Sequence, residues 1–485
     1  MYSLPRLFFV TEKHNVIFIV SDTFRRDHLR CYGNNWIKTK YLEDFASKSI
    51  IFDRAYCASF PTVPARRDIF TGRYSYVYAG WEPLKPDEVV ISEILKKAGI
   101  LTYLIADTPH FLRDGYNFQR GFHGWMWIRG QENDLYLVSP EQVEFPCDPS
   151  KLRNPDFTVV QYLRNISLRR YESDFFVAQT MTEAVKWLER NYGRKGFFLY
   201  IDTFDPHEPW DPPRWYVDMY NPDYTGEEVI YPRYDYCDFL TKEELEHIRA
   251  LYAAEVTLVD RWFGYLYQKI EDMGLLNNTM IIFTTDHGFL LGEHNIVGKS
   301  LIREKEFSFI PLYEEIARIP LIIYHPEIKG GKRIDAIVQL PDLAPTVLDF
   351  LGVEIPETME GKSLIPLMEG EVDEVHEFAV SSPTIKKGPV ANTCTTVTTK
   401  KWSLIFSGKP LKKEVELRDV DSLAKKAKTE EKVRIELYDL EKDPKQEHNI
   451  LGENLDIARE LLYKYIDFLK KLKVPEELIK PWIVL

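Results

Sequence analysis

The stretch S-F-P-T-V-P-A-R-R-D-I-F-T-G-R, residues 59–73, carries the strongest local signal in the chain. Its proline near the start and Gly72 after the last turn are typical helix boundaries, so the pattern predicts a short helix over residues 63–71 with Thr62 as N-cap. The hydroxyl of Thr62 would then lie where free backbone N–H groups and the helix dipole favour an anion. Arg66 adds a positive charge close by. Because a Thr N-cap alone is common, its function depends on the motifs around it.

Two apolar segments outside this stretch have the composition of strands that are buried on both faces of a parallel sheet. Residues 15–21, N-V-I-F-I-V-S, directly precede Asp22, and residues 280–284, M-I-I-F-T, are followed closely by Asp286 and His287. Neither segment alternates between apolar and polar residues. Ligands of open α/β sheets bind at the carboxyl ends of the strands, so we expect these polar side chains to belong to a site. Carboxylate plus imidazole is a plausible half-site for a divalent metal.

Residues 59–73 also resemble a family signature. They are similar to the motif C/S-x-P-x-R, a hydrophobic pair and T-G-R/K of the sulfatase family, within the alkaline phosphatase superfamily. Thr62 stands where that family has the Cys or Ser that becomes formylglycine. Other segments resemble family motifs in the same order, namely D-P-H-E-P with His207, D-H-G-F-L-L-G-E-H before Lys299, and E-L-Y-D-L-E-K-D-P near the C-terminus. The signature positions that match are Pro64, Arg66, Thr71, Gly72 and Arg73.

The resemblance implies a fold with two parts. We expect a large α/β/α domain around a mostly parallel mixed sheet over residues 1–372, and a small C-terminal α+β domain with an antiparallel sheet and a closing helix over residues 373–485. Residues 115–170 are aromatic, charged and irregular, and are predicted to be an insertion on the active-site face. The charged span 409–432 is predicted to be a solvent-exposed excursion.

The resemblance also implies a catalytic site. A divalent cation, Ca²⁺, Mg²⁺ or Mn²⁺, would be held by the side chains of Asp22, Asp286 and His287 with the Thr62 hydroxyl. Thr62 would be the nucleophile, activated by the metal. The remaining catalytic candidates are cations and an acid: Arg66 and Lys299 would stabilise charge on the transferring group, and His207 would protonate the leaving group.

Three positions depart from the family pattern or match it loosely. Thr23 stands where the family has the second residue of an Asp pair, so the metal site loses one negative charge. Asp107 occupies the position of a substrate-binding Lys, and His110 falls near the position of a substrate-binding His. The roles of these three residues are left open.

Thr62 decides the substrate class as far as the sequence does. Oxidation of a Thr at Cβ gives a ketone, so the formylglycine route is closed and no formylglycine is expected, whereas a Thr alkoxide can attack phosphorus. We therefore rank first a hydrolase of phosphoric esters, either diesters, phosphonate monoesters or monoesters. Hydrolysis of sulfuric esters by a variant route ranks second, favoured by the family and disfavoured by Thr62. A non-catalytic relative that only binds an anion ranks third, because so many site residues are retained.

Composition limits the partners. The 485 residues have a net charge of −13 and a pI near 5.5, which argues against binding to nucleic acid. The partner that the resemblance implies is a small anionic ester substrate. We see no signal peptide and no apolar run of membrane-spanning length. The five cysteines are odd in number and widely separated, which favours reduced thiols and a cytoplasmic location. A homo-oligomer remains open.

Overall fold

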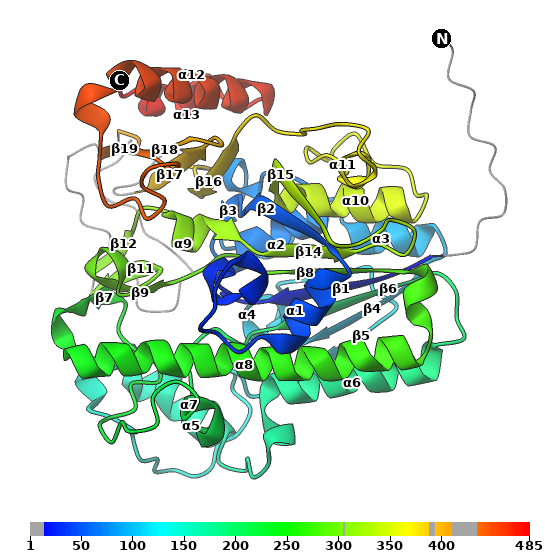
Figure 1. Cartoon of the computed structure of the whole chain (residues 1–485), viewed down its shortest axis with the longest axis vertical. Coiled ribbons are helices and arrows are strands. Elements are labelled where there is room, and N and C mark those ends of the chain that lie inside the picture. Colours follow the sequence, from blue (N-terminus) through cyan, green and yellow to red (C-terminus); the bar gives the residue numbers. More distant parts are fainter. Residues whose placement is uncertain (1–13, 304–305, 388–392, 410–433) are drawn as a thin grey trace.

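A mixed central sheet organises the larger part of the molecule (Figure 1). The computed structural model describes residues 14–303, 306–387, 393–409 and 434–485. Within these residues the central sheet has nine strands between two layers of helices, and a five-stranded sheet with a long helix lies next to it. The predicted fold class is therefore confirmed. The charged span predicted as an excursion lies, apart from Lys409, outside the described residues.

The central sheet is parallel except at one pair of short segments. Strands β2, β8, β1, β6, β4 and β5 run in one direction. Two strands are antiparallel to them: β14 lies between β2 and β8, and β13 pairs with β2 at the edge. The strands of the path are β13 (Arg318–Ile319), β2 (Ile50–Tyr56), β14 (Leu321–Tyr324), β8 (Thr279–Thr284), β1 (Asn15–Ser21), β6 (Phe197–Thr203), β4 (Leu101–Ala106) and β5 (Gly124–Trp127), and β15 (Lys332–Gln339) pairs with β2.

Strand β1 lies at the centre because both of its faces are apolar. Val16, Phe18 and Val20 belong to the core on one side of the sheet, and Ile17 and Ile19 belong to the core on the other side. All five side chains are buried. This is why the segment shows no polar alternation in the sequence, and it confirms the predicted strand over residues 15–21.

Helices cover both faces of this sheet. One layer contains α8, the longest, which begins after Thr241 with a reciprocal capping box to Glu244. Figure 1 shows α8 and α6 side by side along one face, with α2, α3 and α10 on the other. The first layer comprises α1 (Lys40–Ser47), α5 (Val160–Asn165), α6 (Phe176–Asn191), α7 (Arg214–Val217) and α8 (Lys242–Asp272). The second comprises α2 (Thr62–Thr71), α3 (Ile91–Lys97), α4 (Pro109–Leu112), α9 (Glu314–Ala317), α10 (Leu343–Phe350) and α11 (Ile365–Glu369).

The small sheet contains one strand from the N-terminal part of the chain. Its order is β19 (Ile435–Asp439), β18 (Trp402–Ser407), β17 (Cys394–Thr398), β16 (Ala379–Pro383) and β3 (Ser59–Phe60). The last pair is parallel, with Ser382 opposite Ser59 and Pro383 opposite Phe60. Helix α12 (Leu455–Lys471) packs on β17 and β18, and α13 (Glu476–Ile479) follows it. The two residues that precede the predicted nucleophile loop are thus held by the small domain.

One part of the interval predicted as an insertion belongs to the core fold. Residues 124–127 form β5, the parallel edge strand beside β4, so the prediction of an insertion over 115–170 is wrong for this segment. The sequence there, G-W-M-W, is only partly buried, which concealed the strand. The residues after β5 run through irregular loops and α5 before α6 returns to the sheet.

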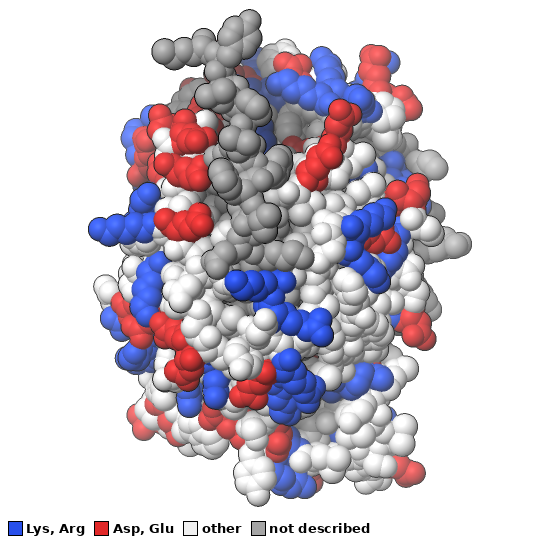
Figure 2. Space-filling view, turned by 90° about the vertical axis from the view of Figure 1, so that its right-hand side faces the viewer, with Lys and Arg blue, Asp and Glu red and all other residues white. Residues whose placement is uncertain are grey.

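Positive and negative charges are intermixed on the surface. Lys and Arg side chains lie among Asp and Glu side chains on the face that Figure 2 shows. None of the five cysteines, which all lie in the described ranges, is disulfide-bonded, as the predicted reduced thiols require. In the described part of the chain, the structure contains no helix that combines the length and the apolar character needed to cross a membrane.

Candidate active site

The predicted metal ligands meet at the carboxyl ends of two adjacent strands. β1 and β8 are parallel neighbours, with Val20 opposite Thr284, so the residues that follow each strand emerge at the same edge. Side-chain donor atoms of Asp22, Asp286 and His287 all lie within 4.8 Å of one another, and all three side chains are fully buried. The sequence-based expectation that strand ends bring these residues together is met in the geometry.

The donor chemistry of this group fits a divalent cation. Asp22 Oδ2 is buried, and its contact among the described residues is an ion pair of 3.0 Å with Arg66 Nη1 that lacks hydrogen-bond geometry. Burial and, next, the neighbouring Asp286 charge raise the pKa of Asp22 well above its usual range, and a cation between the two carboxylates would relieve this repulsion. Burial lowers the pKa of His287 to about 3, so the imidazole is neutral, as a metal ligand must be. The resemblance implies a divalent metal ion, and these three residues would hold it here.

Thr62 opens helix α2 and is not its N-cap. The helix begins at Thr62 itself, and Pro61 takes the cap position without a side-chain hydrogen bond, so the predicted cap is displaced by one residue. The end of the helix is as predicted, with Gly72 in the left-handed conformation. Because the Thr62 hydroxyl is not used as a cap, it is available to the cavity, and its Oγ1 lies 3.5 Å from His287 Nε2. His287 Nδ1 donates to the Gly288 carbonyl, which leaves a lone pair on Nε2.

Arg66 has a different position from the predicted one. It is fully buried beneath the site and does not line the cavity, because its guanidinium is engaged with protein groups. Nε and Nη2 donate to the two oxygens of Asp202 at 3.0 and 2.7 Å, and Nη1 donates to Asp286 Oδ2 at 2.8 Å and to the Thr62 carbonyl at 3.2 Å. Arg66 therefore orients the residues around it, and direct contact with the transferring group is not supported.

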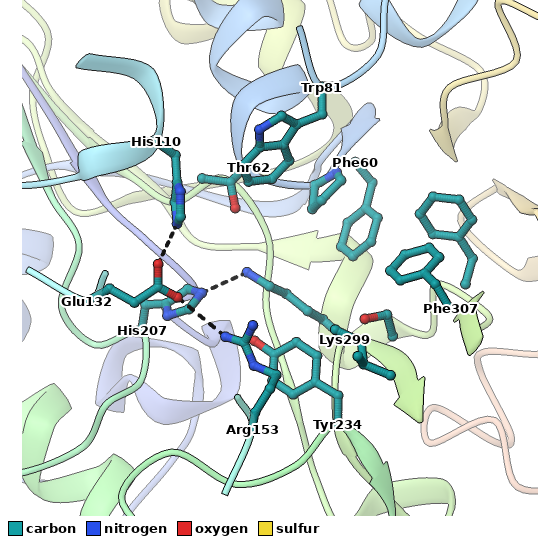
Figure 3. Close-up of a pocket in the computed structure, with 14 residues that line it drawn as sticks. Phe60, Thr62, Trp81, His110, Glu132, Arg153, His207, Tyr234, Lys299 and Phe307 are labelled. Atoms are coloured by element: carbon teal, nitrogen blue, oxygen red, sulfur yellow. Dashed lines mark hydrogen bonds and ion pairs between the residues drawn. The ribbon is translucent and has the colours of Figure 1, made fainter. Parts of the chain in front are cut away.

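Lys299 and His207 form a hydrogen-bonded pair facing Thr62 (Figure 3). Lys299 Nζ lies 3.0 Å from His207 Nε2 and 3.4 Å from His287 Nε2. His207 Nδ1 donates to the Glu208 carbonyl at 2.7 Å. Burial and the Lys299 charge lower the pKa of His207 well below its usual range. The ring is therefore neutral, and its Nε2 accepts a hydrogen bond from Lys299 Nζ.

A cavity of about 60 Å³ lies between these groups. Figure 3 shows Thr62, His207 and Lys299 pointing into it from different segments, with aromatic rings on the side of Phe307. The lining residues are Phe60, Pro61, Thr62, Trp81, His110, Glu132, Arg153, His207, Tyr234, Lys299, Ser300, Ile302, Phe307 and Phe309.

Two charged lining residues were missed by the sequence reasoning. Glu132 and Arg153 come from the irregular interval after β5 and are both buried. Glu132 lies 3.0 Å from His110 and 3.4 Å from Arg153, and Arg153 also contacts Glu208 at 3.0 Å. No motif or periodicity marks either residue, so the sequence offered no signal for them. The predicted placement of this interval on the active-site face is consistent with their positions.

Thr23, Asp107 and His110, whose roles the sequence left open, have three different environments. Thr23 donates its hydroxyl to Asp22 Oδ1 at 2.6 Å, and its backbone N–H donates to Asp286 Oδ1 at 2.9 Å. His110 lines the cavity. Asp107 does not, because its carboxylate accepts hydrogen bonds from Thr180, Thr203 and the backbone of Phe204 below the loop that carries His207.

Comparison with known proteins identifies the class and then the family. The α/β/α core with this strand-end site is that of an ester-hydrolysing enzyme with the alkaline phosphatase-like fold. A family model described as Sulfatase matches residues 14–353, and a model described as N-sulphoglucosamine sulphohydrolase, C-terminal, matches residues 305–423. The chain belongs to the sulfatase family.

Similar proteins are found among curated relatives, and solved structures share the fold. An arylsulfatase of Clostridium perfringens (strain 13 / Type A) is 28% identical over 499 residues, covering 94% of this chain and 95% of the relative. An N-acetylglucosamine-6-O-sulfatase of Bacteroides thetaiotaomicron is 26% identical over 440 residues, covering 74% and 72%. A protein solved in complex with its substrate D-glucosamine-2-N,6-O-disulfate has a TM-score of 0.70 at 23% identity, with 98% and 100% of the two chains covered. The phosphonate monoester hydrolase of Agrobacterium radiobacter has a TM-score of 0.68 at 19% identity, with 95% of each chain covered.

Proposed function

We propose that this enzyme is a metal-dependent hydrolase of phosphoric esters that uses unmodified Thr62 as its nucleophile. The observation that carries the proposal is the position of the Thr62 hydroxyl, which faces the cavity beside His287 and the candidate metal group. A Thr side chain cannot yield an aldehyde on oxidation at Cβ, because Cβ already carries a methyl group. The second hydroxyl of a formylglycine hydrate, which would expel sulfate, therefore has no counterpart here.

The reaction follows from the positions of the protein groups. Thr62, as the alkoxide left when its hydroxyl proton passes to solvent, forms a bond to phosphorus while the bond from phosphorus to the leaving oxygen breaks, which gives a phosphorylated Thr62. His207, whose Nε2 is unprotonated in the resting site, takes a proton from Lys299 Nζ and delivers it to the leaving oxygen. Water then attacks phosphorus while the bond from phosphorus to Thr62 Oγ breaks, and the proton that the water loses returns through His207 to Lys299. A divalent metal held by Asp22, Asp286 and His287 would lower the pKa of the Thr62 hydroxyl and stabilise charge on the phosphoryl oxygens.

The charges around the cavity favour a monoanionic substrate. Arg153 lines the cavity but is paired with Glu132 and Glu208, so its charge is already compensated. Lys299 faces two neutral imidazoles and can turn its charge toward a substrate oxygen. One cation plus a bound metal suits a diester or a phosphonate monoester, which carries one negative charge, better than a dianionic monoester.

Hydrolysis of sulfuric esters is a second candidate function. Two curated relatives named as sulfatases support it, one of them aligned over nearly the whole chain. A sulfate monoester is also a monoanion, so the charge argument does not exclude it. The structural neighbour with a disulfated glucosamine supports a small anionic ester as the kind of substrate in either case. The nucleophile is the feature that separates the two functions.

A four-substrate panel tests the proposal. We expect the full-length protein with Mn²⁺, Ca²⁺ or Mg²⁺ to hydrolyse bis(4-nitrophenyl) phosphate or 4-nitrophenyl phenylphosphonate with kcat/KM at least about 100-fold above that for 4-nitrophenyl sulfate, with 4-nitrophenyl phosphate in between. Release of 4-nitrophenol is the measurement. Preference for the sulfate would reverse the assignment. Binding of all four without turnover would instead support a non-catalytic anion-binding protein.

Replacing His207 with Ala should produce a loss that depends on the leaving group. Esters of poorly acidic alcohols need a proton as the bond breaks, so their kcat should fall by roughly 10² to 10⁴-fold. Esters of 4-nitrophenol need little protonation and should lose much less. The measurement is a plot of log kcat against leaving-group pKa for wild type and His207→Ala. Parallel plots would show that His207 does not donate the proton.

A further inference from the structure

A third buried acid lies beside the candidate metal group without belonging to it. Asp202, at the carboxyl end of β6, is fully buried and pairs in register with Val20 on the neighbouring strand β1, two residues before Asp22. Its oxygens accept hydrogen bonds from Arg66 Nε and Nη2 and, at 2.6 Å, from Thr108 Oγ1. Both oxygens are therefore occupied by protein donors, which leaves Asp202 unsuited to be a metal ligand itself.

The guanidinium of Arg66 is divided between Asp202 and the candidate metal ligands. Asp202 takes two of its three nitrogens in a bidentate pair. The third, Nη1, lies 2.8 Å from Asp286 Oδ2 and 3.0 Å from Asp22 Oδ2, so one nitrogen serves both carboxylates. Because a guanidinium is planar and rigid, its pairing with Asp202 prevents it from turning two nitrogens toward either ligand. Asp202 thus limits how strongly Arg66 competes with a metal.

The net charge of this buried group depends on the same residue. Asp22 and Asp286 together with Arg66 have a formal charge of −1, and Asp202 brings this sum to −2. Lys299, whose Nζ lies 3.4 Å from His287 Nε2 on the cavity side, adds one positive charge next to the group. His287 is neutral and does not change the sum. In a fully buried cluster such charges are weakly screened, so one unit of charge has a large effect on the affinity for a cation.

We propose that Asp202 is a positioning residue for the metal site: it keeps two of the three Arg66 nitrogens away from Asp22 and Asp286 and adds one negative charge to the buried group. The inference rests on the proposed function in so far as that function places a metal at these residues. It assigns to Asp202 an effect on metal affinity, exerted through Arg66 and through its charge, without coordination.

Titration of Mn²⁺ into the metal-free full-length protein tests this directly. Asp202→Asn keeps the shape and removes the charge, and isothermal titration calorimetry should show a rise in Kd of roughly 10 to 100-fold, the usual cost of losing a group that supports metal ligands. Asp260→Asn is the matched control, because Asp260 is also a buried acid but caps α1 through the backbone of Tyr41 and Leu42. The control should bind Mn²⁺ with the wild-type Kd.

Two double variants should restore the Mn²⁺ binding that Asp202→Asn loses, one by placing a carboxylate at position 23 and the other by removing the Arg66 charge as well. Thr23→Asp/Asp202→Asn returns the net charge to −2 with the new carboxylate beside Asp22, and Asp tolerates the left-handed backbone of Thr23 (φ 59°) better than Thr does. Arg66→Gln/Asp202→Asn deletes the ion pair as a unit, which also leaves −2 and removes the competitor. Both should bind Mn²⁺ at least about tenfold more tightly than Asp202→Asn.

The outcomes separate this inference from the proposed function. If wild type binds Mn²⁺ and Asp202→Asn binds it equally well, the inference is overturned while the metal site stands. If wild type binds neither Mn²⁺, Ca²⁺ nor Mg²⁺, the metal site itself is refuted and the inference with it. Should Asp202→Asn not fold, as judged by circular dichroism, the Arg66→Gln/Asp202→Asn variant decides, since wild-type-like binding supports the charge argument and a 100-fold loss contradicts it.

Discussion

Thr62→Ala should reduce phosphoester turnover by roughly 10³-fold or more with little change in fold, because it removes the hydroxyl proposed to form the covalent intermediate. Thr62→Ser keeps the hydroxyl and should stay within about tenfold of wild type. Single-turnover and steady-state kinetics on the preferred diester give the values. Thr71→Ala is the matched control at the other end of α2, where the Thr71 hydroxyl only contacts the Arg67 carbonyl and Tyr78. Full activity of Thr62→Ala would reduce residue 62 to a structural role.

Thr62→Cys extends the same prediction to substrate class. Pro64 and Arg66 already supply the rest of C-x-P-x-R, so a host with formylglycine-generating machinery should modify the new Cys. The hydrated aldehyde then has the second hydroxyl that Thr62 lacks, and turnover of 4-nitrophenyl sulfate should rise above wild type. Mass spectrometry of the peptide that contains residue 62 verifies the modification. If unmodified wild type hydrolyses the sulfate as fast as the modified variant, the argument from Thr62 fails.

Removal of the divalent metal should reduce phosphoester turnover about as much as Thr62→Ala does. After EDTA treatment and desalting, turnover should fall by roughly 10³-fold, because the Thr62 hydroxyl then keeps a pKa far above neutral. Mn²⁺, Ca²⁺ or Mg²⁺ should restore it in wild type but not in Asp286→Asn, which lacks a charged ligand. Elemental analysis gives the metal content before and after treatment.

The same metal should stabilise the fold. Binding to the native state alone adds about 2.7 kcal/mol to the free energy of unfolding at a concentration 100 times Kd, so the melting temperature should rise with added Mn²⁺. Asp260→Asn should respond as wild type does, and Asp286→Asn should respond weakly. A metal-free protein that retains full activity and an unchanged melting temperature would contradict the metal assignment.

Strand ends were the part of the site that the sequence predicted well. Asp22 and the Asp286–His287 pair follow segments that are apolar without alternation, and parallel neighbours bring such ends together. Asp202 lies near the end of β6, a segment of the same kind, and could have been found by the same reasoning, but from this part of the sequence only His207 was predicted to belong to the site. The exact end of a strand depends on pairing with β1 and β4, which a local pattern does not contain.

The remaining misses involve contacts between distant segments. Arg66 was predicted to face the substrate because its motif places it near the nucleophile, but Asp202, 136 positions later, draws its guanidinium beneath the site. Glu132 and Arg153 lie in loops whose path is fixed by tertiary packing, so no pattern in the sequence predicts that they line the cavity. Strand β5 is short and half exposed, and its pairing with β4 alone defines it. Periodicity predicts elements that are buried on a regular face, and these residues are not.

The parallel pairing of β3 with β16 makes the placement of the nucleophile a joint property of two distant parts of the gene. Ser59 and Phe60 are registered against Ser382 and Pro383, and Thr62 follows two residues later. A slip of one residue in that register would displace the chain before Thr62 by about 3.3 Å, while misplacement of a reacting group by about 1 Å can cost 10²-fold in rate. Exchange of the C-terminal domain between homologues should therefore succeed only when the donor preserves this two-residue register, whatever the quality of the rest of the interface.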